Sequence, residues 1–519
     1  MSRHSALVAS GIFLSRVAGL LRESVFAHYF GDSDAADVFR AAFRIPNLLQ
    51  NLFGEGALSA SFIPVYVKLL DPKSQDDADR LASAVFCLLA LAVSFLVLAG
   101  VLATPYLIDV IAPGFSGAKR DLTTSLVRIL FPGAGLLVMS AWCLGILNSH
   151  RRFFVSYTAP VAWNVAMIAT LIGLGRHLTP FPLAKALAWG SVVGSALQIG
   201  VQVPQVARLL GSFKISLNLA SENLKIVIRN FIPVLISRGV VQISAYVDTL
   251  IASFLPTGAL AGLGYAQILY TLPVSLFGMS VSAAELPALS AATGPGEEAA
   301  GYLRARLDSG LRQIAFFIVP CAMAFLALGD VIAGAIYQTG RFTHADAIYV
   351  WAILAGSAVG LLAGTLGRLY ASMYYALRDT RTPLYYAVLR VLLTALLGYV
   401  CALPLPRLLG IDARWGAAGL SGSAGAAAWL EFALLRQSLK GRIGRTGLPG
   451  LFVVKLWVSA AAAAAAGWSA KLALTWPSHH PIFPAAVVLC LYCLVYFVAV
   501  SALRVPEAAS LMQRVKRMV

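Results

Sequence analysis

The stretch of sequence that decides the fold runs from Leu81 to Ala112 and reads LASAVFCLLALAVSFLVLAGVLATPYLIDVIA. Its only charged residue is Asp109, close to the end of the stretch. A helix needs about 20 mostly apolar residues to cross the hydrocarbon core of a bilayer, because each residue advances it by about 1.5 Å. The stretch therefore predicts a helix that crosses a membrane.

Similar apolar stretches recur along the whole chain. We expect fourteen spans, at approximately 6–30, 36–67, 81–112, 122–147, 155–175, 186–204, 230–255, 259–291, 313–337, 347–377, 384–402, 415–435, 450–474 and 482–503. The loops between them are too short for a soluble catalytic domain, which takes roughly 50 residues or more. The sequence thus predicts an all-α polytopic membrane protein with about fourteen transmembrane helices.

The composition agrees with this fold class. Of the 519 residues, 59% are hydrophobic and only 12% are charged, whereas a soluble domain carries about 25% charged residues. This excludes a soluble enzyme, a disordered scaffold and a secreted disulfide framework. The six cysteines all lie in apolar runs, and Cys490 and Cys493 have no second pair beside them, so we expect no redox or metal site there.

The positive charge of the chain is unevenly distributed. The formal net charge is +17, from 40 Lys and Arg against 23 Asp and Glu. With the predicted spans, 23 basic residues fall on the side that holds the N-terminus, 7 on the opposite side and 10 within spans. Cytoplasmic loops of membrane proteins collect Lys and Arg. We therefore expect both termini in the cytoplasm, and no nucleic-acid partner.

Two parts of the chain resemble each other. A Ser-Arg pair, a Leu-Phe-Gly triplet and a proline occur in the same order at 15–16, 52–54 and 64 and again at 237–238, 276–278 and 287. The alternative to duplication is coincidence among Leu- and Gly-rich helices. Duplication predicts two pseudo-symmetric six-helix lobes, 1–212 and 213–445, followed by two extra helices and a basic tail in 446–519.

The second predicted span carries a stripe of polar residues. At 100° per residue they fall within about 140° of one another on the helix. They are Asp37, Arg40, Arg44, Asn47, Gln50, Asn51 and Glu55. The first span adds Arg16, Arg22 and Glu23. Ionisable groups inside a membrane are costly and usually face a cavity or a partner, so we expect these spans to line a water-filled cavity.

An excess of arginine in such a cavity suits an anionic substrate, because a guanidinium group binds phosphate oxygens in pairs. In the seventh span, Arg238 and Gln242 lie one turn apart on one face and extend the same candidate site. Two alternatives are that the second span is a solvated surface helix, or that ion pairs such as Asp37 with Arg40 merely offset each other.

Five motifs spread over most of the chain carry a resemblance to a known family. They read SRVAGLLRE at 15–23, ADVFRAAFRIPNLL at 36–49, FGEGALSASFIP at 53–64, YQTGRFT at 337–343 and ALRDTRTP, on a predicted cytoplasmic loop, at 376–383. In this order they resemble the MurJ/MviN family of lipid II flippases. Several ordered motifs make a far more specific signal than hydropathy alone.

The resemblance implies a member of the multidrug/oligosaccharidyl-lipid/polysaccharide exporter superfamily. Its expected activity is to move lipid II, the undecaprenyl-pyrophosphate-linked peptidoglycan precursor, across the bacterial inner membrane by alternating access. Expected partners are lipid II, membrane lipids and the cell-wall synthesis machinery. In the family, basic residues of helices 1, 2 and 8 bind the pyrophosphate, and the last two helices hold the polyprenyl tail. By position, this implies a substrate-binding role for Arg16, Arg22, Glu23, Asp37 and Glu55.

The sequence departs from the family pattern at two places. Gln50 stands where the family often has an arginine, and Ile268 stands where helix 8 commonly has another. We expect Arg40, Arg44 and Arg238 to restore the positive field.

Some members of the family also bind sodium in the second lobe, through an acid in helix 7 and acid or amide groups in helix 11. Asp248 matches the first by position, but the helix 11 positions hold Thr394 and Gly398, which makes a monovalent-cation site doubtful. No other cofactor is expected.

The other functions considered make different demands on the sequence. A flippase for another polyprenyl-pyrophosphate-linked oligosaccharide would use the same phosphate chemistry. A drug or cation antiporter of the same superfamily would offer acids and aromatics instead of arginines. A membrane glycosyltransferase needs clustered acids or metal ligands, and a scaffold needs no buried charge. Because the chain has no Walker motif, we expect an ion gradient, the membrane potential or downstream consumption to drive transport.

Overall fold

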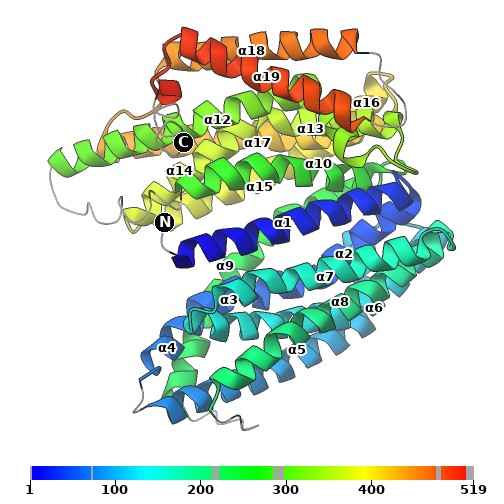
Figure 1. Cartoon of the computed structure of the whole chain (residues 1–519), viewed down its shortest axis with the longest axis vertical. Helices are drawn as coiled ribbons and strands as arrows, with labels where there is room; N and C mark the ends of the chain where they lie inside the picture. Colours follow the sequence, from blue (N-terminus) through cyan, green and yellow to red (C-terminus); the bar gives the residue numbers. More distant parts are fainter. Residues whose placement is uncertain are drawn as a thin grey trace. The chain divides into compact units, whose positions relative to one another are not determined.

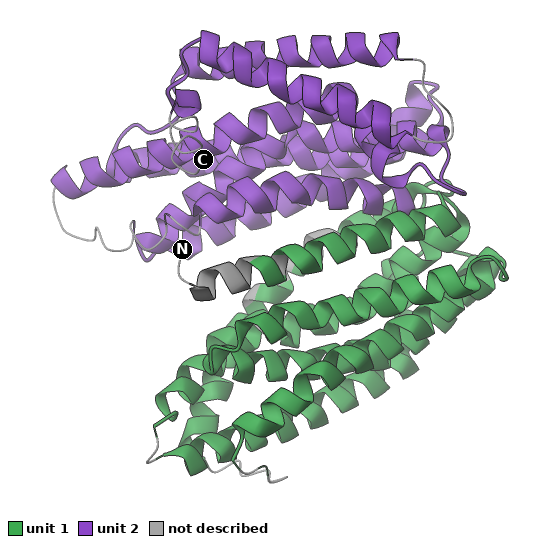
Figure 2. Cartoon of the chain, in the orientation of Figure 1, with its two compact units in different colours: residues 1–260 green, residues 261–519 purple. Residues whose placement is uncertain are grey.

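The computed structural model describes residues 3–71, 74–211, 213, 221–282, 285, 289, 297–474 and 481–509, and in these ranges every regular element is a helix. The chain divides into two compact units, residues 1–260 and 261–519 (Figure 2). The predicted all-α fold is confirmed. The lobe boundaries expected at 212 and 445 come from the proposed sequence duplication, and they stay a prediction.

Unit 1 contains nine helices in the part of the chain that is described (Figure 1). They are α1 (Arg3–Phe30), α2 (Asp34–Phe53), α3 (Glu55–Ser61), α4 (Ile63–Lys68), α5 (Gln75–Ile111), α6 (Gly117–Ser149), α7 (Phe153–Leu174), α8 (Pro180–Leu209) and α9 (Glu222–Ser253). Helix α6 packs against α2, α5 and α8, and its residues Trp142 and Ile146 lie in a buried core with Phe62 and Leu81. This core fixes the position of α2, which carries the polar stripe.

Unit 2 begins within α10 (Ala259–Pro273), which runs into the π-helical turn η1 (Val274–Met279). The helices that follow are α12 (Glu297–Tyr337), α13 (His344–Val359), α14 (Leu361–Ala376), α15 (Arg381–Ala402), α16 (Pro404–Leu408), the short η2 (Ala413–Trp415), α17 (Gly416–Ile443), α18 (Gly450–Ala473) and α19 (Ile482–Ala502). Helix α12 packs against α13, α14, α18 and α19.

Within the described residues, each predicted span lies on a helix or on consecutive helices, but the count of fourteen is not confirmed. Ten described helices are long and apolar enough to cross a membrane, or eleven if α13 and α14, bent by 42° at their junction, form one span. Helix α2 shows why apolarity is a poor guide here, since it carries Asp37, Arg40 and Arg44 within 20 residues.

The second predicted span, 36–67, is divided into α2, α3 and α4. Helix α2 begins where the Ser33 hydroxyl accepts a hydrogen bond from the Ala36 N–H, at 3.4 Å. It ends at Gly54, whose N–H donates to the Gln50 carbonyl at 2.8 Å, and only glycine fits here because a Cβ would overlap that carbonyl oxygen. In the predicted second copy of the repeat, the triplet 276–278 lies in the π-helical turn η1. Both triplets therefore mark an irregularity in a helix, while Pro287 lies outside the described residues.

A proline inside a helix leaves one backbone carbonyl without its helical hydrogen-bond donor, and a neighbouring helix can supply a donor instead. Pro320 in α12 has no N–H to donate to the carbonyl of Phe316, one turn earlier. That carbonyl accepts a hydrogen bond from the Tyr496 hydroxyl of α19 at 2.7 Å, and the Pro320 carbonyl accepts one from Tyr492 at 2.7 Å. The ion pair of Lys471 with Asp330 joins α18 to α12 as well. Helices α18 and α19 are thus attached to unit 2 by specific polar contacts.

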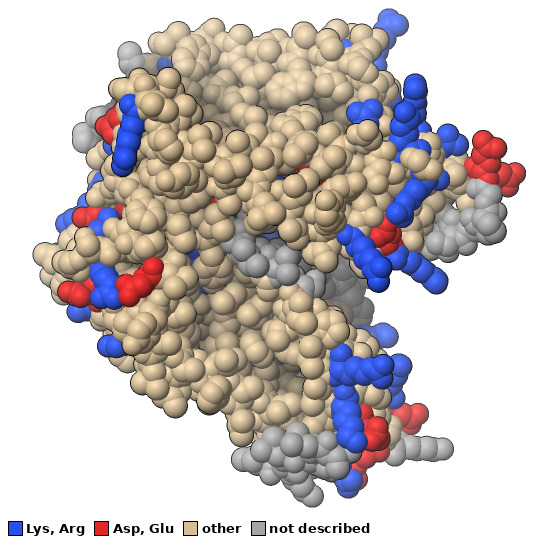
Figure 3. Space-filling model, turned by 180° about the vertical axis from the view of Figure 1, so that it is seen from behind, with Lys and Arg blue, Asp and Glu red and all other residues tan. Residues whose placement is uncertain are grey.

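Charged residues are unevenly distributed over the surface. On the face that the space-filling view shows, Lys, Arg, Asp and Glu side chains lie mainly towards two opposite edges, and uncharged residues cover most of the area between them (Figure 3). Such a distribution is typical of helices whose sides contact lipid. The chain is therefore a multi-pass membrane protein, as its sequence predicts.

The ALRDTRTP motif forms a cap at the start of α15. One carboxylate oxygen of Asp379 accepts the N–H groups of Arg381 and Thr382, both at 3.0 Å, and the other accepts the Thr382 hydroxyl at 2.7 Å. Arg442, at the end of α17, also donates to Asp379, at 2.6 Å. The backbone and side-chain hydrogen bonds from Thr382, together with Arg442, lower the pKa of Asp379 to about 2.

We expect Asp379→Ala to destabilise unit 2 by about 1 kcal/mol at neutral pH, the usual cost of losing a helix N-cap. Asp379→Asn keeps an acceptor for the cap and should lose less. Because the pKa of Asp379 is lower in the folded protein, its stabilisation is complete at neutral pH and is lost as the pH falls from about 4 towards 2. Thermal unfolding of the detergent-purified variants measures this. Equal unfolding temperatures for Asp379→Ala and the unchanged chain at pH 7 would contradict it.

Candidate anion-binding site in unit 1

Glu23 of α1 lies at the centre of a charged cluster. Its side chain is only 4% exposed, and its two carboxylate oxygens form ion pairs with Arg22 of α1 and Arg40 of α2. The Arg22 guanidinium lies over the Trp163 ring at 4.7 Å from its centroid, and that of Arg40 lies over Phe26 at 4.8 Å. Two cations thus share one buried anion, and the three side chains carry a net charge of +1.

The geometry of this cluster restricts both arginines. A carboxylate on one side and an aromatic face on the other leave each guanidinium little freedom to reorient. About a fifth of each arginine side chain stays exposed, 19% for Arg22 and 20% for Arg40. The donors that remain exposed are therefore held in place before an anion arrives, and this reduces the entropy lost on binding.

Arg44 lies one turn beyond Arg40 on α2 and contacts α9. Its guanidinium donates to the Thr249 hydroxyl at 2.7 Å, and the Tyr246 hydroxyl donates to the Arg44 carbonyl at 3.0 Å. The negative charge of Asp248 attracts the Arg44 guanidinium, and the like charge of Arg40 repels it. Arg40 and Arg44 therefore concentrate positive charge on one side of α2.

A second contact between α2 and α9 lies where α2 ends. Asn51 donates to the Gln242 side-chain oxygen at 3.1 Å, and Arg238 donates to the Asn51 carbonyl at 3.3 Å. Gly56, at the start of α3, makes room for this arginine, because a Cβ there would overlap the Arg238 guanidinium. The positive charge of Arg238 is thus placed beside the residue that follows Gln50, which is the position where the family often has an arginine.

Asp37 lies at the opposite end of α2 and takes part in a different network. It is 2% exposed and accepts the N–H of Gly258 at 2.8 Å. The Lys119 amine of α6 is 3.5 Å from Asp37 and 2.6 Å from Asp34, and Thr257 donates to Asp34 at 2.6 Å. The first turns of α2 and α6 and the loop after α9 are therefore joined at this end of unit 1.

The carboxylate of Asp34 in this network is stabilised by its neighbours. Partial burial opposes ionisation of Asp34, but hydrogen bonds from Lys119 and Thr257 together lower its pKa below the usual value.

Gly258 has a φ of +93°, and a Cβ there would overlap the Asp32 carboxylate. A glycine is therefore required at this point of the loop after α9.

The structure brings some of the predicted residues together and separates others. Arg22, Glu23 and Arg40 form one cluster. Arg44 donates to Thr249 of α9 and interacts electrostatically with Asp248. Arg238 and Gln242 both bond to Asn51 at the end of α2. Asp37 belongs to the network at the other end of the helix. Gln50 is half-buried and lines a space of about 10 Å³ beside α6, enough for one water molecule.

The remaining two predicted residues are not placed in a cluster. Arg16 is exposed on α1 and forms no ion pair with the residues that the structure describes. The side chain of Glu55 lies outside the described part of the structure.

Several residues that contact the site carry only a weak signal in the sequence, or none. Thr249 and Tyr246 lie on the face of α9 that holds Arg238 and Gln242, at spacings of three and four residues, so a search for a second polar stripe would find them. Trp163 on α7 carries no such signal, because an aromatic residue in an apolar helix is ordinary. Lys119 lies in the first turn of α6 and also carries no such signal.

The possible sodium site at Asp248 stays a prediction. Asp248 already faces a cation, the guanidinium of Arg44. The corresponding α15 positions hold one hydroxyl group, Thr394, and one residue without a side chain, Gly398. Within the described residues, no group of three or more His, Cys, Asp or Glu side chains could hold a metal ion.

A family model described as lipid II flippase MurJ matches residues 26–483. A lipid II flippase MurJ from Burkholderia cenocepacia is 32% identical over 443 residues, which cover 84% of this chain and 83% of that protein. A probable lipid II flippase MurJ from Rhizobium meliloti is 29% identical over 512 residues, which cover 93% of this chain and 90% of that protein.

Solved structures show the same fold. A lipid II flippase MurJ in an inward closed conformation matches with a TM-score of 0.78 and 23% identity, and covers 96% of this chain and 98% of that one. An inward-facing multidrug resistance transporter of the MATE family matches with a TM-score of 0.66 and 17% identity, over 82% of this chain and 95% of that one. Since the family model spans most of the sequence and its relatives align over nearly their full length, the chain belongs to the lipid II flippase MurJ family.

Proposed function

We propose that the chain is a transporter that moves lipid II, a polyprenyl-pyrophosphate-linked peptidoglycan precursor, from the inner to the outer leaflet of the bacterial inner membrane. Family membership supports this reaction. The observation that carries it in the structure is the cluster of Arg22 and Arg40 around the buried Glu23. It presents oriented guanidinium donors on membrane helices, which is the chemistry that a pyrophosphate requires.

The proposed cycle begins with the head group entering from the cytoplasmic side. Arg16, Arg22, Arg40 and Arg44 offset the two charges of the pyrophosphate, and the uncharged Gln50 and Gln242 offer hydrogen bonds to the sugar–peptide. Arg238 adds positive charge at the end of α2. Their excess over Glu23 and Asp248 keeps the site attractive to an anion and unattractive to a cationic drug. This is the reason for preferring a flippase over a drug or cation antiporter.

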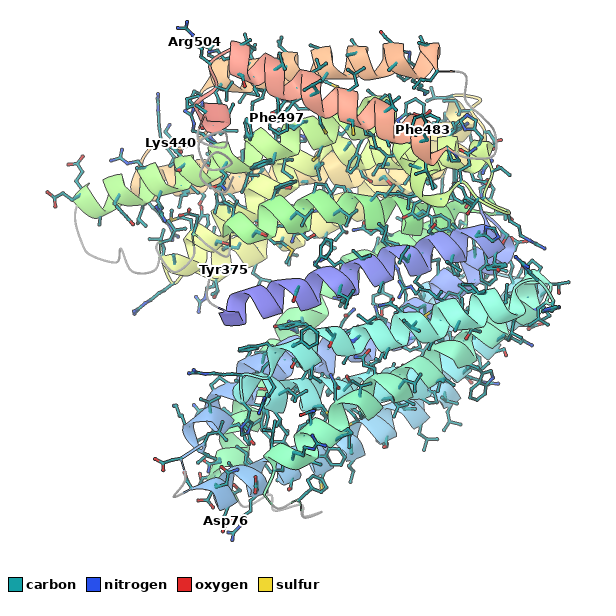
Figure 4. The ribbon with its side chains drawn as sticks, in the orientation of Figure 1. Asp76, Tyr375, Lys440, Phe483, Phe497 and Arg504 are labelled. Carbon is teal, nitrogen blue, oxygen red and sulfur yellow. The ribbon has the colours of Figure 1, made fainter. Side chains whose placement is uncertain are left out.

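The polyprenyl tail stays in lipid, and we propose that it lies against α18 and α19. Phe483 and Phe497 of α19 are 75% and 39% exposed (Figure 4), as suits contact with hydrocarbon. We further propose that the network of Asp37, Lys119 and Gly258 keeps the outer end of unit 1 closed while the head group enters. Outward opening would then require the Asp37–Gly258 hydrogen bond to break.

The orientation is part of the same proposal. Both termini lie in the cytoplasm, because most Lys and Arg residues outside the predicted spans fall on that side. Cell-wall synthesis enzymes on the outer face would consume the product. A flippase for another polyprenyl-pyrophosphate-linked oligosaccharide remains the second candidate, since the charged cluster recognises a feature that both substrates share.

Depletion of the protein in its native bacterium distinguishes these two substrates. We expect lysis, with lipid II accumulating in the inner leaflet and protected from a reagent that cannot cross the membrane. Labelling of lipid II from outside, before and after depletion, is the measurement. Normal peptidoglycan together with a lost capsule or O-antigen would instead assign the second substrate.

We expect Arg44→Ala and Arg238→Ala each to lower transport about tenfold or more, because a hydrogen bond to a charged group contributes about 1.5–3 kcal/mol. Transport of lipid II in reconstituted vesicles measures this, and the Lys variants should fall between. Lys225→Gln on α9 is the matched control, since its surface pair with Glu222 contributes little. If both alanine variants transport normally, these arginines do not compensate for Gln50 and Ile268.

Gly56→Ala tests the position of Arg238 without removing its charge. The added methyl group should displace the guanidinium from the Asn51 carbonyl and lower transport as much as Arg238→Ala does, with little loss of stability because the end of an arginine side chain can move. Gly19→Ala is the control, as a Cβ there meets nothing within 4 Å. The double variant Gly56→Ala/Arg238→Ala should be no worse than Arg238→Ala alone. An additive loss would show that Gly56 acts in another way.

A further inference from the structure

A second group of basic residues lies in unit 2, at the end of α17, and takes no part in the site described above. It lines a cavity of about 590 Å³ whose walls include Trp429, Phe432, Arg436, Lys440, Arg445 and Thr446. Cavities that bind small molecules are commonly about 300–1,000 Å³. The cavity is therefore large enough for the head group and first carbons of a lipid.

The lining residues are ordered along the helix by polarity. Positions 429, 432, 436 and 440 recur at spacings of three and four and so lie on one face of α17. At about 1.5 Å per residue, Trp429 and Lys440 are about 16 Å apart along the axis. The face changes along this distance from aromatic to basic. A phospholipid changes in the same order, from acyl chain to phosphate.

The basic end of the cavity is built on a fixed loop. Arg436 donates to the Thr446 carbonyl at 3.0 Å, and the buried Thr446 hydroxyl is bonded to Tyr370 at 3.1 Å. Lys440 and Arg445 are exposed and form no ion pair with the described residues, and Lys440 extends from the helix ribbon (Figure 4). Their charges are therefore available to a ligand.

Among the residues that the structure describes, no acidic side chain lines this cavity. The acid that acts on Arg436 is Asp308 of α12, which accepts the Gly447 N–H at 2.9 Å and lies outside the lining. Three cations thus face one space without a carboxylate among them. Such a space favours an anionic ligand over a zwitterionic or cationic one.

The aromatic end is held in place but stays accessible. The Trp429 indole N–H donates to the Val359 carbonyl at 2.8 Å, and its side chain is 40% exposed. Phe432 packs edge-on against Tyr370, with ring centroids 5.5 Å apart. Both rings belong to a helix that is long and apolar enough to span the membrane. A water-soluble anion would leave this apolar end of the cavity empty.

We propose that this cavity binds an anionic phospholipid, with its phosphate between Lys440 and Arg445 and its first acyl carbons against Trp429 and Phe432. Basic pockets beside membrane helices recognise anionic head groups in this way. The bound lipid would brace the loop between α17 and α18. The proposal needs only that the chain spans a membrane, so it stands or falls independently of the transport reaction.

Native mass spectrometry of the full-length protein, titrated with phosphatidylglycerol, tests the proposal. Lys440→Gln/Arg445→Gln should weaken binding of one lipid about 30-fold, from the usual contribution of two basic residues near an anionic membrane surface. Arg381→Gln, which removes an exposed charge of the same unit outside the cavity, should bind as the unchanged chain does. Equal binding by the double variant would overturn the proposal.

Two competitors identify the ligand class. Phosphatidylethanolamine and inorganic phosphate should each fail to displace phosphatidylglycerol at equal concentration. Displacement by phosphatidylethanolamine would mean that charge is not recognised, and displacement by phosphate would mean that the site binds a soluble anion. Either result contradicts the proposal.

A second measurement does not depend on the basic variants. Phosphatidylglycerol with brominated acyl chains should quench tryptophan fluorescence, and Trp429→Phe should remove part of that quenching. Unchanged quenching in Trp429→Phe would place the acyl chain elsewhere and refute the orientation.

Discussion

The ionised Glu23 buried among membrane helices is the constraint on which the candidate site depends. An isolated charge in this environment is very unfavourable, and Arg22 and Arg40 make it tolerable by pairing with both of its oxygens. The pairing joins α1 to α2, and the Trp163 ring of α7 covers the Arg22 guanidinium. Loss of one partner of a buried pair costs about 3–5 kcal/mol. The same carboxylate thus orients the anion-binding groups and joins the helices that carry them.

The requirement that polar groups find partners extends to the backbone. Tyr246 donates to the Arg44 carbonyl, and Tyr496 donates to the carbonyl that Pro320 leaves without its helical donor. A hydrogen bond between membrane helices contributes about 0.6–2 kcal/mol, so several are needed to fix one pair of helices. The contacts of α2 with α9 supply such a set, since Thr249 and Gln242 add two more. Polar residues of the candidate site therefore also determine how α2 packs against α9.

The sequence alone predicts the helices of this protein well, because hydropathy acts locally. It also predicts the polar face of α2, where Asp37 and Arg44 lie two helical turns apart on one side. It does not predict that Arg40 pairs with Glu23 instead of Asp37, or that Arg44 reaches Thr249, because these partners meet only after packing. The break at Gly54 is equally hidden, since Gly54 is one of many glycines and its role depends on the Gln50 carbonyl. Local patterns thus identify the residues, and tertiary contacts assign their partners.

The two Ser-Arg pairs of the repeat show how similar motifs come to act differently. Arg16 is exposed on α1, whereas Arg238 on α9 is held against the Asn51 carbonyl by the space that Gly56 leaves. Helix α9 belongs to the same compact unit as α2, although the repeat assigns it to the second half of the chain. A basic residue from the second half therefore supports the end of α2, where Gln50 provides no charge. The proposed compensation for Gln50 therefore depends on a side chain whose position is set by the Asn51 carbonyl and by Gly56.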